Sequence, residues 1–499
     1  MSASEDDRTP VLVGIGVVTR HEEDYTQAPE AMDLMLEAVA SAGADTSSEQ
    51  VLAGLQYIAV PRGRWGYSNP AGEIARKFGA REAVTVLSTP GVLQQTLVGE
   101  ACARIARGEA HTTLIAGADT GYRILKAQMA KGALTERVQS DQPDVYMKPK
   151  DELRHEVERR SGLQMPVGLY AILESAYRAS KGWSIAEHRD RLAALLSRFS
   201  DIAAHNPNAW QKTAVSAAAI REASDRNPMQ AFPYTRYHCS TWNVDQASAL
   251  LFCSAARAEA LGIPRSKWVF PLASIESNHM VAVSARADLV SCPGAGITGR
   301  AALEAGDLTV DQIDLVDLYS CFPLAVETYA AEVGLSHTRD LTVTGGMPFA
   351  GGPYNNYFLQ STCRAAELLR EGRGRNALLS CVSGVVTKQA FALWSVNKPK
   401  RPFTHADLTS QVARAMATFE VVENFSGNAT VAGYTVLYGR GQVPKAVVLV
   451  DTPDGKRAMA ISEDPALIAA MEQTEWVGRT VTIAENLVTG SPDETNFRS

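Results

Sequence analysis

The sequence has no apolar run that approaches the roughly 18 residues a membrane-spanning helix needs. Its first residues are polar and acidic, unlike the basic and then apolar start of a secretory signal. Seven cysteines are scattered along the chain without a CxxC pair, which argues against a disulfide framework and against a zinc site. These absences predict a cytoplasmic protein with reduced thiols, no membrane span and no bound metal.

Strong charge of one sign is also missing. Charged residues make up 21% of the chain and the formal net charge is -7, so no field that would hold a nucleic acid is expected. Hydrophobic residues make up 45% of the 499 positions, and a chain of this length exceeds one ordinary core. The composition predicts a globular protein of two or three domains that does not bind nucleic acid.

Strand-like and helix-like segments alternate in the first part of the chain. Residues 10–18 form a short apolar run rich in β-branched residues, which is typical of a strand buried on both faces of a parallel sheet. Residues 31–42 have helical composition, and residues 57–60 and 83–87 return to strand-like composition. This alternation predicts an α/β fold.

One supersecondary unit occurs twice. In residues 88–120 a turn of small residues precedes an amphipathic helix, a glycine-containing stop and an apolar strand. Residues 351–384 follow the same plan about 260 residues later, a distance far beyond the period of about 20 to 50 residues found in solenoids. The repeat therefore predicts two similar halves.

Two segments fall outside the duplicated plan. Residues 121–230 are rich in charged residues, Gln and Ala, which predicts a helical insertion that covers a site. After a proline-containing boundary at residues 398–402, short strand-like runs predict a small closed antiparallel barrel of the OB kind. These runs are residues 418–422, 430–438, 446–451, 458–461 and 480–484, with one helix at 465–471. Residues 490–499 are expected to form a disordered tail.

Five segments, in order, are similar to motifs of the thiolase superfamily. Residues 87–119 resemble the nucleophile segment, in which a Cys-x-Ser/Thr-Gly turn opens a helix that leads into a strand. The other four are residues 242–247 at the Asn-Asp-Gly-Ala stretch, 313–322 (IDLVDLYSCF) where sterol-carrier-protein-type thiolases have His-Asp-Cys-Phe, 345–353 (GGMPFAGGP) at Gly-Gly…Gly-His-Pro, and 380–384 (SCVSG) at Cys-x-Gly. Over residues 10–405 the chain resembles the thiolase-like proteins of type 1.

This resemblance implies a duplicated thiolase fold. Two βαβαβαββ halves would form a five-layer α/β/α/β/α arrangement, with a helical loop insertion and a small C-terminal antiparallel β-barrel. The implied domains are an N-terminal half at residues 1–262 that includes the insertion 121–230, a C-terminal half at 263–405, and an extra OB-like barrel at 406–499.

The resemblance also places the family's catalytic positions on this chain. The nucleophile position falls on Ser88, the base position on Gly352 and the histidine of His-Asp-Cys-Phe on Val316, so that only the second cysteine is retained, as Cys381. Thiolase chemistry needs a thiolate at a helix N-terminus, an imidazole that activates it, and hydrogen-bond donors for an enolate oxygen. Losing one such group costs about 100- to 1000-fold in rate. We therefore expect an acetyl-CoA acetyltransferase by ancestry that lacks thiolase activity.

Three functional hypotheses follow. The first is a protein of lipid metabolism that binds acyl-CoA or a related lipid thioester, with no other cofactor. The second is a carbon–carbon lyase or acyltransferase that uses Tyr319 and Tyr354 with Ser88 or Cys381, because some thiolase-like lyases of sterol breakdown use tyrosines together with a small OB-fold partner. A shifted alignment would bring in His279 as a base. The third is a non-catalytic scaffold whose barrel binds a protein partner.

Overall fold

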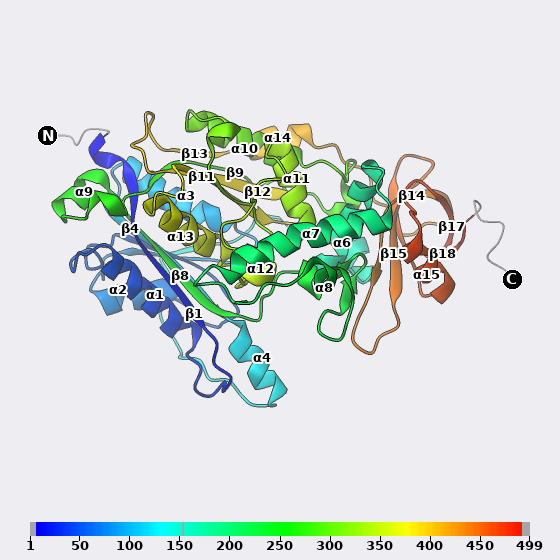
Figure 1. Ribbon diagram of the computed structural model, residues 1–499, viewed down its shortest axis with the longest axis horizontal. Helices are drawn as coiled ribbons and strands as arrows, with labels where there is room; N and C mark the ends of the chain where they lie inside the picture. Colours follow the sequence, from blue (N-terminus) through cyan, green and yellow to red (C-terminus); the bar gives the residue numbers. More distant parts are fainter. Residues whose placement is uncertain (1–5, 152–153, 492–499) are drawn as a thin grey trace.

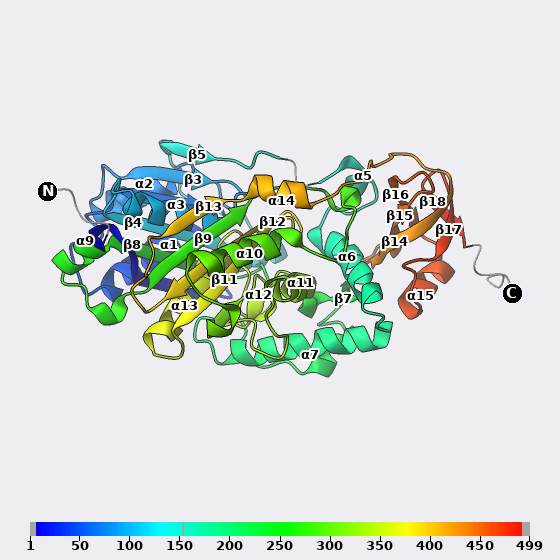
Figure 2. The ribbon, with the colours of Figure 1, turned by 90° about the horizontal axis from the view of Figure 1, so that it is seen from above.

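The computed structural model describes residues 6–151 and 154–491. Figure 1 shows an α/β body at one end of the molecule and the orange and red strands of a C-terminal barrel at the other. Helix α6 (Pro166–Ser180) lies between the two parts in both Figure 1 and Figure 2, whereas α7 (Ile185–Ala204) runs along one side of the body in Figure 2. Within the described ranges, no helix combines the length and the apolar character that crossing a bilayer requires.

The first sheet of the body has six strands in the order β1-β8-β4-β2-β3-β5. Its strands are β1 (Pro10–Arg20), β8 (Asp245–Ser254), β4 (Thr112–Thr120), β2 (Tyr57–Pro61), β3 (Val84–Ser88) and β5 (Val145–Met147). The parallel pairing expected for residues 10–18 is wrong, because β1 is an edge strand that pairs antiparallel with β8. Its buried character instead reflects the layers that cover both of its faces.

The second sheet has five strands in the order β10-β11-β12-β9-β13. Its strands are β10 (Leu315–Asp317), β11 (Asn376–Ser383), β12 (Lys388–Ser395), β9 (Phe270–Ser277) and β13 (Thr404–Asp407). Strands β11, β12 and β9 pair antiparallel, whereas β10 and β13 add parallel edges. Their side chains are almost all buried because helices cover both faces.

The sheets and helices form alternating layers. Helices α3 (Gln94–Ala106) and α13 (Tyr357–Arg370) lie between the two sheets, as the internal repeat predicts, and each leads into a strand, β4 or β11. The outer faces carry α1 (Ala31–Asp45) and α2 (Pro70–Phe78) on the first sheet and α10 (Pro293–Ala305) and α11 (Pro323–Val333) on the second. The mixed α/β fold predicted from the sequence is confirmed.

The contact between β1 and α1 depends on two glycines. A Cβ atom at Gly14 would lie 2.2 Å from the carbonyl oxygen of Ala42, and one at Gly16 would lie 2.0 Å from that of Ala38. Both distances are far below van der Waals contact, so any side chain would push the helix away from the sheet. The Gly-Ile-Gly sequence therefore sets the spacing of this outer layer.

The insertion is helical, as expected. It contains α4 (Gly121–Met129), α5 (Glu156–Arg160), α6, α7 and α8 (Ala217–Arg221), followed by the short strands β6 (Met229–Ala231) and β7 (Tyr234–Thr235). The remaining short helices of the body are α9 (Ala255–Ala260), α12 (Gly346–Phe349) and α14 (Thr409–Ala415). Helix α6 is buried over most of its length because it packs against both the body and the barrel.

The C-terminal region forms a closed barrel of five strands. They are β14 (Gly427–Leu437), β15 (Lys445–Asp451), β16 (Arg457–Ser462), β17 (Thr480–Ala484) and β18 (Leu487–Gly490), with α15 (Pro465–Gln473) after β16. Strand β14 pairs with both β15 and β17, which closes the ring, and every pair is antiparallel except β16–β18. Residues 418–422, expected as a strand, form only isolated bridges. Most of the expected tail, residues 492–499, lies outside the described residues.

The barrel is joined to the insertion by more than the chain connection. Strand β14 pairs with β6, so the barrel continues into a seven-stranded sheet. Gly433 of β14 approaches α6 so closely that a Cβ atom would lie 2.9 Å from the carbonyl oxygen of Ile172. The buried guanidinium of Arg178 donates to Glu475 at 2.7 Å and to the hydroxyl of Tyr434 at 2.8 Å.

Replacing Arg178 should test this junction. Arg178→Met leaves the buried hydroxyl of Tyr434 without its donor and removes the ion pair to Glu475, so we expect the free energy of unfolding to fall by about 2 to 4 kcal/mol. Urea denaturation measures the change. Arg160→Met is the matched control, because Arg160 pairs with Glu423 of the C-terminal segment at the surface, and its loss should cost less than about 1 kcal/mol. Equal effects of the two changes would contradict a buried polar tie.

Candidate functional site

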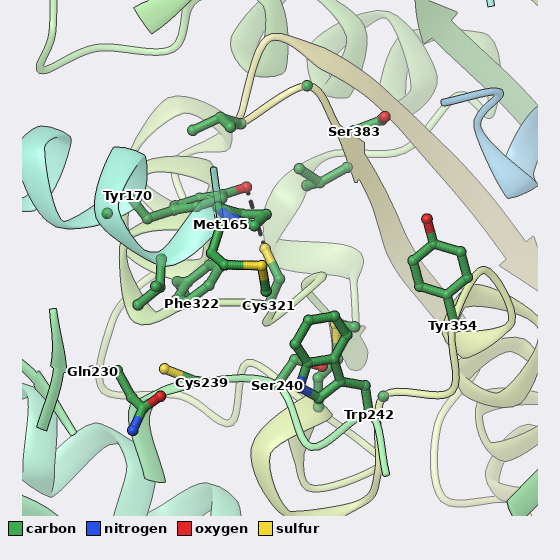
Figure 3. Close-up of a pocket in the computed structure, with 18 of the residues that line it drawn as sticks. Met165, Tyr170, Gln230, Cys239, Ser240, Trp242, Cys321, Phe322, Tyr354 and Ser383 are labelled. Atoms are coloured by element: carbon green, nitrogen blue, oxygen red, sulfur yellow. Dashed lines mark hydrogen bonds between the residues drawn. The ribbon is translucent and has the colours of Figure 1, made fainter. Parts of the chain in front are cut away.

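A cavity of about 990 Å³ lies where the two halves, the insertion and the barrel meet. Figure 3 shows side chains that line it. The lining comes from segments far apart in the chain, within residues 90–94, 162–170, 319–322, 352–355, 381–385 and 437–445. Its size is at the upper end of the range of about 300 to 1,000 Å³ that is typical of small-molecule sites.

The thiol of Cys381 lies against the N-terminus of α3. The backbone amides of Gln94 and Gln95 donate toward its sulfur and favour the thiolate, but burial is the larger effect and raises the pKa of Cys381 to about 11. The side chain is only 1% exposed. At neutral pH the group is therefore a protonated thiol and not a nucleophilic thiolate.

Tyr319 lines the cavity beside this helix terminus. Its backbone amide donates to Ser380 at 2.9 Å, and its ring packs edge-on against Tyr357 at 5.5 Å. Burial raises the pKa of the Tyr319 phenol well above its ordinary value, although the side chain of Gln94 hydrogen-bonds to it. A phenol in this state can donate a hydrogen bond but is a poor base.

Next to Tyr319, the Cys321 thiol lies 3.2 Å from the hydroxyl of Tyr170, the contact drawn as a dashed line in Figure 3. The ring of Tyr170 in turn stacks on Phe322 with centroids 4.4 Å apart. Burial raises the pKa of Cys321 and of Cys239, a third cysteine of the lining, to about 12. Every thiol of the cavity wall is therefore neutral at physiological pH.

Gly352 lines the cavity at a place that admits no side chain. A Cβ atom there would lie 2.0 Å from Ser240 Oγ and 3.1 Å from Met347 Cε. The Gly352 amide also donates to the carbonyl of Thr241 at 2.8 Å, which holds the segment in place. A histidine in place of Gly352 could not be accommodated without displacing Ser240.

The other expected site residues lie in different surroundings. Ser88 ends β3, is 1% exposed, and is not among the cavity-lining residues; within the described ranges its hydroxyl has no hydrogen-bond partner. Val316 lies in β10 within the core, also away from the cavity. Tyr354 does line the cavity and is 36% exposed, and burial with the nearby Asp119 raises the pKa of its phenol. The cavity therefore brings together Tyr319, Gly352, Tyr354 and Cys381.

Of the residues that line the cavity in the described part of the chain, none is a histidine. His279 lies on the loop after β9, and burial lowers the pKa of its imidazole. His238 is buried and hydrogen-bonds to the hydroxyl of Thr235 at 2.9 Å. An imidazole base is therefore absent from this lining.

The loop after Cys381 has an unusual backbone. Gly384, Val385 and Val386 have φ angles of 63°, 58° and 52°, which place two β-branched residues in the left-handed region. The buried guanidinium of Arg286 donates to the carbonyls of Gly384 at 3.2 Å and Val385 at 2.6 Å. Arg457 of the barrel donates to the carbonyl of Arg286, so the barrel supports this wall of the cavity.

At Val385 a glycine variant should be more stable than an alanine variant, which is the reverse of the usual order. A protein with alanine at a given position is usually more stable than one with glycine there. In a left-handed conformation the order reverses, because any Cβ atom is penalised. We expect Val385→Gly to be more stable than Val385→Ala by about 1 kcal/mol, measured by urea denaturation. At Val17, half-buried in the extended strand β1, the same pair of changes should favour alanine. If the alanine variant is the more stable one at both positions, the result would contradict a left-handed conformation at Val385.

One group of residues in the described ranges has donor atoms close enough to hold a metal ion. The ligand atoms of Glu174, His188 and Glu327, which belong to α6, α7 and α11, lie within 4.8 Å of one another. Glu174 accepts hydrogen bonds from His188 at 2.9 Å and from the Tyr234 hydroxyl. Burial and the neighbouring Glu174 carboxylate raise the pKa of Glu327 well above its ordinary value. We therefore expect Glu327 to be neutral at physiological pH.

Glu327→Gln tests the protonation of this group. Because the folded state raises the pKa of Glu327, its stabilising contribution is complete below the ordinary carboxyl pKa and is lost as the pH rises toward the folded value. The wild-type free energy of unfolding should therefore fall relative to that of Glu327→Gln, by up to about 1.4 kcal/mol per pH unit. Urea denaturation at mildly acidic and mildly alkaline pH measures this. Parallel pH dependences would contradict the expectation, and stabilisation of the wild type alone by Zn²⁺ would indicate a metal site.

Comparisons with known proteins identify proteins that are similar to this chain. Residues 407–486 match the family model described as thiolase-like protein type 1 additional C-terminal domain. A crystal structure of a monomeric SCP2-thiolase like protein type 1 from Mycobacterium smegmatis superposes with a TM-score of 0.81 at 26% sequence identity, covering 97% of this chain and 100% of that one. No curated protein sequence matches the chain.

Two further solved structures share the fold of the body. The Ltp2-ChsH2(DUF35) aldolase has a TM-score of 0.60 at 17% identity, with 79% of this chain and 100% of that one covered. An acetyl-CoA acetyltransferase from Syntrophomonas wolfei has a TM-score of 0.54 at 17% identity, with coverages of 78% and 99%. The layered body defines a thiolase-like protein. With its extra C-terminal domain, the chain is similar to the thiolase-like proteins of type 1.

Several residues of the cavity were not predicted from the sequence. Cys321 carried a usable signal, because Cys321-Phe322 matches the end of the family's His-Asp-Cys-Phe motif. An alignment on that dipeptide puts the histidine position on Tyr319, which lines the cavity, and not on Val316, which does not. Tyr170 and residues 437–445 had no such signal, because they belong to the insertion and the barrel.

Proposed function

We propose that the protein binds an acyl thioester of the acyl-CoA class in this cavity and does not catalyse thiolase chemistry. The observation that carries the proposal is a large cavity whose wall combines apolar surface with neutral hydrogen-bonding groups at the N-terminus of α3. A thioester is itself a neutral group with one strong acceptor, and an acyl chain needs apolar surface. Both requirements are met in one cavity.

The chemistry of the wall argues against Claisen condensation and thiolysis. Attack on a thioester needs a thiolate, and the thiol of Cys381 has a pKa of about 11. No imidazole among the described lining residues is placed to remove its proton. The thiolase base position, aligned with Gly352, has no room for a side chain. Because nucleophile and base fail together, turnover as a thiolase should be negligible.

Binding gives the hydroxyl of Tyr319 a direct role. A phenol with a raised pKa keeps its proton, so it can donate a hydrogen bond to the thioester carbonyl. The thiol of Cys381 and the α3 terminus lie on the same side of the cavity and would orient that carbonyl. Tyr354 is at the more exposed part of the lining and would contact the ligand as it enters.

A carbon–carbon lyase is the second candidate. What favours it is the presence of Tyr319 and Tyr354 in one cavity, since a retro-aldol reaction needs one group to accept a hydroxyl proton and another to stabilise the enolate oxygen. The raised pKa of both phenols opposes the first of these tasks. We therefore rank binding without carbon–carbon chemistry above the lyase.

Ligand binding can be measured through stability. At a concentration about 100 times its dissociation constant, a ligand should raise the free energy of unfolding by about 2.7 kcal/mol. We expect acyl-CoAs to raise the melting temperature, whereas alkyl-CoA thioethers, which lack the thioester carbonyl, should do so less. Ser383→Trp should abolish the effect, because Ser383 lines the cavity and is only half-buried. Ser266→Trp, at an exposed position away from the cavity, is the control. Equal shifts in both variants would place the ligand elsewhere.

Tyr319→Phe separates the two candidates. If the protein only binds, the change should weaken acyl-CoA binding by about five- to tenfold through loss of one hydrogen bond of about 1 kcal/mol, and neither protein should form product from 3-hydroxyacyl-CoAs. Chromatography of the incubated thioesters gives the readout. Chain-shortened product from the wild type, absent with Tyr319→Phe, would establish the lyase instead.

A further inference from the structure

The cavity wall combines hydrogen-bonding groups with apolar side chains. The ends of the body's strands and helices supply hydrogen-bonding groups, such as Gln94, Tyr319 and Ser383. The insertion and the barrel supply apolar side chains, namely Met165, Pro166, Val167, Leu437, Tyr438 and Val443, together with the polar side chains of Arg154, Gln230, Gln442, Lys445 and Glu463. An acyl thioester likewise has a polar carbonyl at one end and a hydrocarbon chain at the other, and the apolar side chains of the insertion and barrel suit the chain.

The barrel part of this wall is held firmly in place. It consists of the end of β14 and the hairpin 438–444 that leads into β15. The amide of Tyr438 donates to the carbonyl of Gln230 at 3.1 Å, and the amide of Phe232 donates to Val436 at 2.8 Å. Leu437 lies close to the start of α6, since a Cβ atom at Gly168 would meet its Cδ2 at 2.8 Å. The hairpin is therefore positioned against the cavity by backbone pairing as well as by packing.

Exposed apolar surface is concentrated around the cavity. The described residues include nine large hydrophobic side chains that are exposed, and four of them line this one cavity: Met165, Trp242, Tyr354 and Val443. Val443, at the hairpin, is 66% exposed. A gathering of exposed apolar side chains marks a surface that an apolar group covers. Here the surface is continuous with an interior cavity, which fits a chain entering the protein.

We propose that the β14–β15 hairpin is the wall that binds the hydrocarbon chain of the ligand and sets the chain length that the protein prefers. This inference rests on the proposed function, since it assigns one end of the same ligand. The C-terminal domain is then part of the binding site and not an appended module. Each methylene that the hairpin covers should strengthen binding about fourfold.

The experiment compares acetyl-CoA, octanoyl-CoA and palmitoyl-CoA by titration calorimetry with the full-length protein. Val443→Asp places a charge against the chain, so the dissociation constant for palmitoyl-CoA should rise about tenfold or more, while that for acetyl-CoA should change less than about twofold. Val443→Trp fills the space, and should weaken palmitoyl-CoA binding while leaving octanoyl-CoA binding intact. Because Val443 is exposed, neither change should affect folding.

Leu487→Asp is the matched control, since Leu487 is an exposed apolar residue of the same barrel that does not line the cavity. It should leave all three dissociation constants unchanged. Palmitoyl-CoA binding that is equal in wild type and both Val443 variants would overturn the hairpin as the chain-binding wall while leaving the proposed function intact. Binding of none of the three thioesters to the wild type would overturn both.

Discussion

The packing of α3 and α13 between the two sheets removes water from the sulfur of Cys381. Two backbone amides at the start of α3 favour its thiolate, yet burial dominates and the pKa rises to about 11. The same desolvation acts on Tyr319, Cys321 and Cys239, so the thiols and this phenol of the cavity wall are all neutral. A site of neutral donors suits recognition of an uncharged thioester, and the proposed function follows from that balance of burial and hydrogen bonding.

The barrel belongs to the site as well as to the fold. Strand β14 pairs with β6, Arg178 reaches across the junction, and Arg457 supports Arg286, which in turn holds the left-handed loop at Gly384–Val386. Two valines in left-handed conformations are costly unless the surrounding structure compensates. The contacts of the C-terminal domain therefore extend to within a few residues of Cys381.

Much of the fold was predictable from local patterns. The repeated helix and strand of the two halves, the helical insertion and the small barrel all have signals in periodicity and composition. The pairing of β1 was not predictable, because a strand covered on both faces has the same apolar sequence whether its neighbour is parallel or antiparallel. Part of the site was predictable through the family motifs, which led to Gly352, Cys381, Tyr319 and Tyr354. The alignment that placed a catalytic position on Val316 shows the weakness of motif matching. Val316 lies in the core, whereas Tyr319, three residues later, lines the cavity.

The sequence by itself determined the layered α/β body, the absence of a histidine at the aligned catalytic positions, and the presence of an extra barrel, because these depend on residue identity and on periodicity within short segments. Only the tertiary structure decided which thiols and phenols share a cavity, how strongly burial shifts their protonation, and that residues 437–445 form part of the wall. Those properties depend on contacts between segments that are hundreds of residues apart. The sequence of one short segment does not indicate which distant segments bury its side chains.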